Sequence, residues 1–156
     1  MKWPSLVIVL SLLLVSACGG SNPLAPSPSV PNYAGNWSGS YVLSGCNQSG
    51  GMALANFCAN LGATMPYGLA LTQSGSNVSG SFSLGQITFS STGGTVSGDG
   101  SLTLNGSTVS NGNTIIVTWA LRLSGSALSG TLTQVWTSST LSGQINMVGT
   151  ISTAVR

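Results

Sequence analysis

Residues 115–136 read IIVTWALRLSGSALSGTLTQVW, in which two runs of alternating apolar residues flank one turn signal. The first run covers residues 115–123. The second covers residues 128–136, where Gly130 and Gln134 share the parity of the apolar residues. A period of two places one set of side chains on one face of a strand. Ser124-Gly125-Ser126 lies between the runs and favours a tight turn. The stretch therefore predicts an antiparallel hairpin with one buried face.

The same alternation continues through the chain from Tyr33 onward. It recurs in residues 37–43, 67–71, 78–84, 87–89, 102–104 and 145–151. The intervening positions are mostly Ser, Thr, Asn and Gln, so each strand has one apolar and one polar face, as antiparallel sheets commonly do. Further turns are predicted at residues 74–77, 91–94 and 111–113, so that successive strands pair as hairpins. Only residues 52–61 have a helical character.

A weak internal repeat accompanies these turns. Residues 74–82, SGSNVSGSF, align with residues 124–132, SGSALSGTL, and the shorter unit of an apolar residue, Ser and Gly recurs at residues 96–98 and 141–143. We expect each unit to begin a strand after a turn, and its glycine to let the strand bend or a neighbour approach closely. Ser/Gly filler without structural meaning is the alternative. The irregular spacing argues against a solenoid.

Eight or nine strands in a meander can bury their apolar faces in a barrel or in a sandwich. Gly35-Asn36-Trp37 opens the first strand and resembles the Gly-x-Trp motif of the calycin barrels, the lipocalin and avidin-like families. The resemblance implies a single antiparallel up-and-down β-barrel, with Trp37 as a structural plug at its closed end. No basic partner for Trp37 is evident near the last strand, since Arg122 lies earlier and Arg156 is terminal. A β-sandwich is the alternative.

The first 18 residues have a pattern of charge and hydropathy that is typical of targeting signals. Lys2 precedes an apolar run over residues 6–15, which is shorter than a typical transmembrane helix. Val15-Ser16-Ala17-Cys18 resembles the lipobox of bacterial lipoproteins. The resemblance implies cleavage before Cys18 and acylation of Cys18, and Gly19 after the cysteine favours an outer-membrane anchor. An ordinary secretory signal with an incidental cysteine is the alternative.

This interpretation divides the chain into three parts: a signal peptide over residues 1–17, the lipidated Cys18 with a Pro/Ser-rich tether up to residue 32, and a barrel domain over residues 33–156.

With Cys18 assigned to lipid, Cys46 and Cys58 form an even pair, and a disulfide closing about a dozen residues is the leading interpretation. Two free thiols or a metal pair are the alternatives. No His or acidic residue stands ready to complete a zinc site.

The charge inventory excludes most function classes. After residue 17 the charged side chains are Asp99, Arg122 and Arg156, and the chain has no His. Nothing can neutralise a row of phosphates, so nucleic-acid binding is disfavoured. Catalysis lacks an activating base, so we expect no enzyme, no metal and no cofactor. Asp99 lies in Gly98-Asp99-Gly100 and is interpreted as a turn residue.

Binding of a small molecule is the leading functional hypothesis, because barrels of about eight strands hold either packed side chains or one small ligand. Parity places these residues inside: Trp37, Tyr41, Tyr67, Phe82, Phe89, Trp119, Gln134 and Trp136. From them we predict contacts to an apolar or amphipathic ligand by Tyr41, Phe82, Trp119, Gln134 and Trp136. The first alternative is an envelope structural module, or one docking a protein or glycan, with a fully packed core. The second is an integral outer-membrane barrel with its apolar face outward.

Overall fold

Strands form in each stretch where apolar residues alternate. The computed structural model describes residues 29–156, so the predicted signal peptide and Cys18 lie outside the described residues. The strands are β1 (Gly35–Gln48), β2 (Thr64–Ser74), β3 (Asn77–Leu84), β4 (Ile87–Val96), β5 (Ser101–Ser110), β6 (Asn113–Ser124), β7 (Ala127–Ser138) and β8 (Gln144–Val155). The helical character predicted after β1 appears as two 3-10 helices, η1 (Gly50–Ala55) and η2 (Phe57–Asn60).

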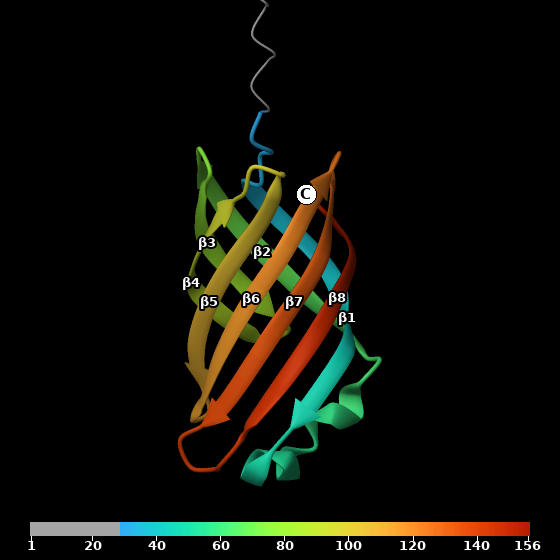
Figure 1. The fold of residues 1–156 in the computed structure, drawn as a ribbon, viewed down its shortest axis with the longest axis vertical. Helices are drawn as coiled ribbons and strands as arrows, with labels where there is room; N and C mark the ends of the chain where they lie inside the picture. Colours follow the sequence, from blue (N-terminus) through green and yellow to red (C-terminus); the bar gives the residue numbers. More distant parts are fainter. Residues whose placement is uncertain (1–28) are drawn as a thin grey trace, which may run out of the picture.

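The eight strands form one antiparallel ring. Each strand pairs with its neighbours in sequence, and β8 pairs with β1 to close the ring (Figure 1). The sheet is continuous and does not divide into the two separate sheets of a sandwich. It is not a regular barrel, because register shifts interrupt the β1–β8, β3–β4 and β7–β8 pairings. Within residues 29–156, no helix is long and apolar enough to cross a bilayer.

The apolar faces of the strands point into the ring. In β6, Ile115, Val117, Trp119 and Leu121 are buried, whereas the residues between them are exposed or half-buried. Seven of the residues assigned to the interior by parity are buried: Trp37, Tyr41, Tyr67, Phe82, Phe89, Trp119 and Gln134. Trp136 is half-buried. An arrangement with the apolar face outward is therefore not the one that this structure adopts.

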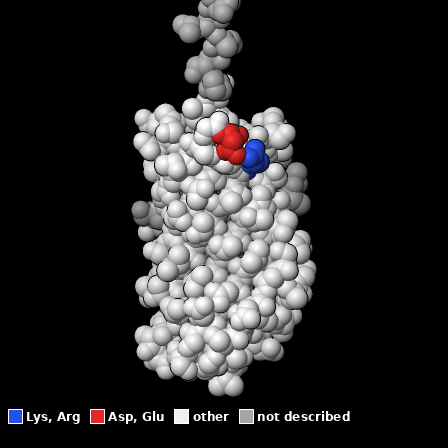
Figure 2. All heavy atoms as spheres, viewed as in Figure 1, with Lys and Arg blue, Asp and Glu red and all other residues white. Residues whose placement is uncertain are grey.

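The two ends of the ring differ. One end carries residues 29–34, the C-terminus and the turns after β2, β4 and β6, and is called the terminal end (Figure 1). The other carries η1, η2 and the connections after β3, β5 and β7, and is called the helical end. The acidic and basic side chains visible on the face in Figure 2 gather at the terminal end. The polar surface between the ends is mainly Ser and Thr.

One predicted turn is wrong. Residues 91–94 do not reverse the chain but lie inside β4, and the turn to β5 follows at residues 97–100. A Cβ atom on Gly94 would lie 1.9 Å from the backbone oxygen of Thr103 on β5, so glycine is needed here because two backbones approach closely. The Gly-Gly pair therefore marks a tight contact between strands, which sequence alone does not distinguish from a turn.

The repeat is confirmed in its longer form only. Gly80 and Gly130 occupy equivalent places in the β2–β3 and β6–β7 hairpins, and a Cβ atom on either would lie 2.0 Å from a backbone oxygen of the preceding strand. The shorter units do not begin strands as expected. Val96 ends β4, and residues 141–143 lie in the loop before β8.

A candidate ligand pocket at the helical end

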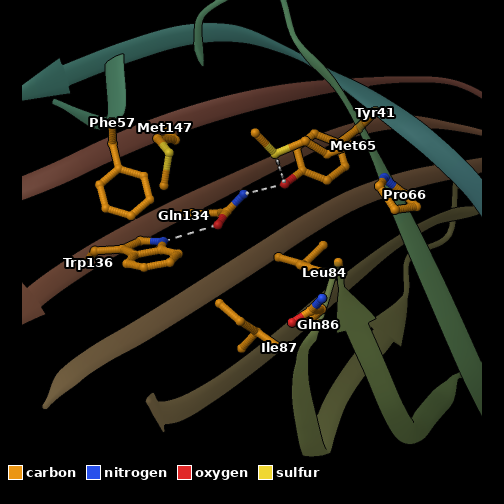
Figure 3. A pocket seen from close by; sticks show the side chains of 11 residues that line it. Tyr41, Phe57, Met65, Pro66, Leu84, Gln86, Ile87, Gln134, Trp136 and Met147 are labelled. Atoms are coloured by element: carbon orange, nitrogen blue, oxygen red, sulfur yellow. Dashed lines mark hydrogen bonds between the residues drawn. The ribbon is translucent and has the colours of Figure 1, made fainter. Parts of the chain in front are cut away.

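The interior opens to solvent at the helical end in a pocket of about 250 Å³ (Figure 3). Exposure falls from the rim inward: Pro66 and Gln86 are exposed, Phe57 and Trp136 are half-buried, and the innermost lining side chains are buried. These inner residues are Tyr41, Leu84, Gln134 and Met147. The walls are mostly apolar, as in small-molecule sites.

The structure divides the five predicted ligand residues into two groups. Tyr41, Gln134 and Trp136 line the pocket. Phe82 and Trp119 do not line it but lie in the packed core, where the Phe82 ring stands 5.4 Å from the Trp119 ring in an edge-to-face contact. Phe82 also stacks on Phe89, with 4.2 Å between ring centroids. Toward the helical end the interior holds the pocket and also a second buried cluster, formed by Leu43, Met52, Ile145 and Met147.

A chain of hydrogen bonds crosses the inner part of the pocket. The Trp136 indole Nε1–H donates to Gln134 Oε1 at 3.1 Å, and Gln134 Nε2 donates to Tyr41 Oη at 3.3 Å. Tyr41 Oη in turn donates to Met65 Sδ at 3.2 Å (Figure 3). Because an indole N–H can only donate, the amide oxygen of Gln134 must face Trp136 and its NH2 group must face Tyr41. Burial raises the pKa of Tyr41 above its ordinary value, so its hydroxyl stays protonated at neutral pH.

The place of Tyr41 depends on a glycine of the neighbouring strand. Gly149 faces inward from β8, beside Tyr41 on β1. A Cβ atom at this position would lie 2.5 Å from Tyr41 Cδ2 and 3.1 Å from Leu132 Cγ. The missing side chain therefore leaves the space that the phenol ring fills, which directs the Tyr41 hydroxyl toward Gln134.

The disulfide between Cys46 and Cys58 is present and holds η2 against β1. It brings Phe57 to the pocket rim, where the ring lies 5.0 Å from the Trp136 ring. Gln48 supports the same loop, because its Oε1 accepts from the Cys58 N–H at 3.0 Å and its Nε2 donates to the Met52 carbonyl at 3.2 Å. The disulfide thus shapes one side of the pocket mouth.

Sequence reasoning missed several lining residues: Phe57, Met65, Pro66, Leu84, Gln86, Ile87 and Met147. Leu84, Ile87 and Met147 fall on the apolar parity, but nothing in the pattern tells a side chain at the pocket from one in the packed core. Phe57 lies outside the strands. Its position beside Cys58 was the available signal, since a disulfide would hold that segment near β1.

Two polar atoms lie buried without a hydrogen-bond partner among the described residues, Tyr67 Oη and Trp119 Nε1. The two rings contact each other, with 5.2 Å between centroids. Tyr67 lies two residues from Met65 on the same face of β2 and pairs with Leu84, so it is adjacent to the pocket wall. Burial raises the pKa of Tyr67 to about 12.

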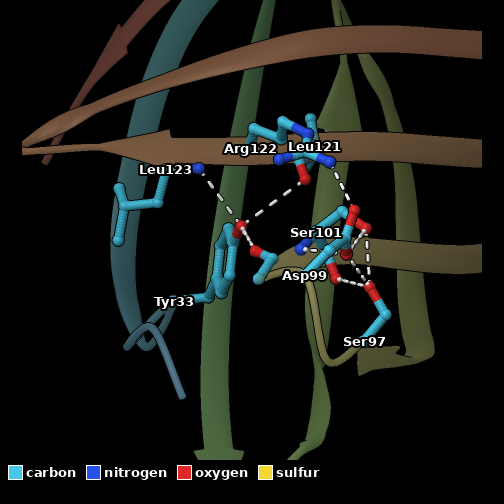
Figure 4. A network of polar contacts seen from close by, with 8 residues as sticks. Tyr33, Ser97, Asp99, Ser101, Leu121, Arg122 and Leu123 are labelled. Carbon is cyan, nitrogen blue, oxygen red and sulfur yellow. Dashed lines mark hydrogen bonds and ion pairs between the residues drawn. The ribbon is translucent and has the colours of Figure 1, made fainter. Parts of the chain in front are cut away.

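A polar network around Tyr33 lies at the terminal end (Figure 4). Tyr33 Oη donates to the Gly100 carbonyl at 2.7 Å and accepts from the Leu123 N–H at 3.1 Å. Asp99 accepts hydrogen bonds from Ser97 and Ser101 and forms an ion pair with Arg122. These hydroxyl and amide donors, led by Ser97, hold the pKa of Asp99 well below its ordinary value. The turn interpretation of Asp99 is confirmed.

Trp37 also lies at the terminal end and is buried. Its indole Nε1–H donates to the Tyr33 carbonyl at 2.9 Å. The guanidinium carbon of Arg156 lies 4.5 Å from the centroid of the Trp37 ring, within the range of a cation–π contact. The expectation that Trp37 has no basic partner is therefore wrong. The terminal residue reaches the ring because β8 ends beside the start of β1.

Comparison of the chain with protein-family models, with curated proteins and with solved structures finds no match.

Proposed function

We propose that this chain is a non-enzymatic binding protein that holds a small apolar or amphipathic molecule at the helical end of the ring. The observation that carries the proposal is the pocket itself, where apolar walls surround one buried amide, Gln134. A buried amide in a packed core would use its hydrogen-bonding groups internally. Gln134 uses one lone pair on Trp136 and one N–H on Tyr41, and it lines a hollow of about 250 Å³ with its second lone pair and second N–H free.

We further propose that the ring is a barrel of the calycin type. Three features support this assignment: neighbour-to-neighbour strand order, Gly35-Asn36-Trp37 at the start of β1, and Arg156 stacked on Trp37. In that interpretation Trp37 is the structural plug of the closed terminal end. The pocket then lies at the end where such barrels take up ligands.

The N-terminal signal supports an anchor in the bacterial outer membrane through acylated Cys18. Residues 29–34 enter the ring at the terminal end (Figure 1). An anchor upstream of them would leave the pocket mouth at the opposite end, away from the attachment point. The lining residues are apolar or uncharged polar side chains, and the titratable group among them is the Tyr41 phenol, which burial keeps protonated at neutral pH.

Native mass spectrometry of the full chain extracted from its own membrane tests this proposal. Digestion first establishes whether Cys18 is acylated and Cys46 is bridged to Cys58. A reproducible extra mass that dissociates on activation is expected. Acylated protein without any added mass would count against a ligand-carrying barrel.

A docking role in the envelope is the second candidate, and an exposed apolar cluster favours it. Val109, Ile116 and Val135 point outward from β5, β6 and β7, with Ile116 paired to Val135 across the sheet. Val109 is 72% exposed and Ile116 is 50% exposed. Co-elution of a second polypeptide that is lost on Ile116→Ser, with no small added mass, would favour this role.

A further inference from the structure

We propose that the pocket selects uncharged ligands that carry a single hydroxyl or carbonyl oxygen, and that this oxygen binds at Gln134 and Tyr41 with the apolar body toward the mouth. This inference rests on the proposed function, because it names the class of ligand for the same pocket. The pocket should therefore bind neutral amphiphiles such as alcohols and ketones more tightly than fatty acids and amines of equal length.

The distribution of charge in the molecule disfavours ionic ligands. Among residues 29–156 the charged side chains are Asp99, Arg122 and Arg156, and all three lie at the terminal end. None of the described residues around the pocket carries a charge. A carboxylate or ammonium group placed beside Gln134 would be buried without a counter-charge, which costs free energy and weakens the binding of a charged ligand. A neutral oxygen carries no such cost.

The polar chain, meaning the hydrogen-bonded row of Trp136, Gln134, Tyr41 and Met65, has unused hydrogen-bonding capacity. Gln134 spends one lone pair on Trp136 and one N–H on Tyr41, so one lone pair and one N–H remain. Tyr41 donates to the Met65 thioether, which is a weak acceptor. A ligand oxygen can accept a hydrogen bond from the spare N–H of Gln134, and it can accept the Tyr41 O–H hydrogen bond in place of Met65 Sδ. One hydroxyl or carbonyl oxygen, with its two lone pairs, is therefore enough to accept from both donors.

The depth of the polar groups in the pocket sets the orientation of the ligand, and the pocket volume sets its size. Tyr41 and Gln134 are each 3% exposed, whereas the rim residues Pro66 and Gln86 are exposed. The polar group of a ligand must therefore enter first and leave its apolar part against Phe57, Ile87 and Trp136. A volume of about 250 Å³ equals the liquid volume of about eight waters, so a molecule of about eight to ten non-hydrogen atoms fits.

Isothermal titration calorimetry with matched eight-carbon probes tests the inference. The full chain, in a fixed concentration of detergent, is titrated with 1-octanol, 2-octanone and octanoate, with empty micelles as the blank. At about pH 8 we expect 1-octanol and 2-octanone to bind at least about tenfold more tightly than octanoate. At about pH 4 the octanoate disadvantage should shrink, because the ligand's own carboxyl becomes protonated.

Two variants assign this preference to the polar chain. Gln134→Leu and Tyr41→Phe should each weaken 1-octanol about tenfold while changing butylbenzene, a probe without a hydrogen-bonding group, by no more than about twofold. Micelle partitioning is the same for each protein and cancels between them. Gln144→Leu, the same substitution at an exposed position outside the pocket, should leave all affinities unchanged.

The outcomes distinguish the two proposals. Octanoate bound as tightly as 1-octanol at about pH 8, or equal losses of 1-octanol and butylbenzene in both variants, would overturn the ligand class and leave the binding function standing. Failure of every probe, butylbenzene included, to bind the native chain would overturn the binding function and the ligand class together.

Discussion

At the scale of single residues, two tyrosines with inward-facing rings have opposite surroundings. The Tyr41 hydroxyl both accepts and donates a hydrogen bond, whereas the Tyr67 hydroxyl is buried without a partner among the described residues. A buried hydroxyl that makes no hydrogen bond loses its contacts with water and gains nothing in return. The same substitution at the two sites should therefore have different effects.

Tyr67→Phe should leave the free energy of unfolding unchanged or raise it by up to about 1 kcal/mol, because it removes an unpaired buried hydroxyl. Tyr41→Phe should lower it by about 1 kcal/mol, because it removes a paired one. Urea denaturation of both variants beside the native chain measures the difference. A loss of more than about 1 kcal/mol in Tyr67→Phe would mean that its hydroxyl is satisfied in solution.

Alkaline pH gives a second measurement on Tyr67. Burial raises its folded pKa to about 12 from the ordinary value of 10.0, so the folded state favours the neutral phenol. The stability linked to this shift is fully present below pH 10.0 and is lost as the pH rises toward 12. Tyr67→Phe should therefore lose less stability than the native chain over that interval, as followed by urea midpoints.

At the scale of the elements, η1 and η2 carry one wall of the pocket mouth and are tied to β1 by the disulfide. Cys46→Ser with Cys58→Ser should lower the free energy of unfolding by about 3 kcal/mol, from the entropy of the released loop. Phe57 should also leave Trp136, which red-shifts the tryptophan emission. Leu54→Ser, at an 85% exposed position of the same loop, is the matched control and should change neither quantity. An unchanged emission in the double variant would show that Phe57 is held by other contacts.

Strand β4 offers a matched pair of adjacent glycines. Gly94→Ala places a methyl group against the Thr103 carbonyl and should cost at least about 2 kcal/mol, since β5 must move. Gly93→Ala meets no atom within 4 Å and should change the free energy of unfolding by less than about 0.5 kcal/mol. Thermal unfolding of the two variants compares them directly. Equal effects would be incompatible with Gly94 at the contact between β4 and β5.

At the scale of the whole molecule, stability should hardly respond to pH in the neutral range. Residues 29–156 contain no histidine, both of their cysteines are bridged, the pKa of Asp99 is lowered, and those of Tyr33, Tyr41 and Tyr67 are raised. The contribution of Asp99 is fully present above its ordinary pKa of 3.8 and is lost only as the pH falls below it.

We therefore expect the melting temperature to change by less than about 2 °C between about pH 5 and about pH 9, because folding exchanges almost no protons there. Differential scanning calorimetry over this range is the measurement. A shift of more than about 5 °C would reveal a titrating group linked to folding that these residues do not supply.

Alternation alone determined much of this molecule. It predicted the eight strands, their inward faces and the interior position of Gln134, because the period of a strand fixes which side chains share a face. The cysteine count likewise predicted the disulfide. Residues 91–94 were misassigned because glycine serves equally in a turn and at a close approach of two strands.

The part that each inward side chain plays depends on how the strands are arranged in three dimensions. The alternating pattern places Phe82, Trp119, Tyr41 and Gln134 equally inside the ring, yet of these four only Tyr41 and Gln134 line the pocket, and Tyr41 also belongs to the core cluster that holds Phe82 and Trp119. The difference depends on how far along the ring axis each residue lies, and that depends on register and ring closure between strands far apart in sequence. Arg156 reaches Trp37 for the same reason, since closing β8 on β1 joins the two ends of the described chain.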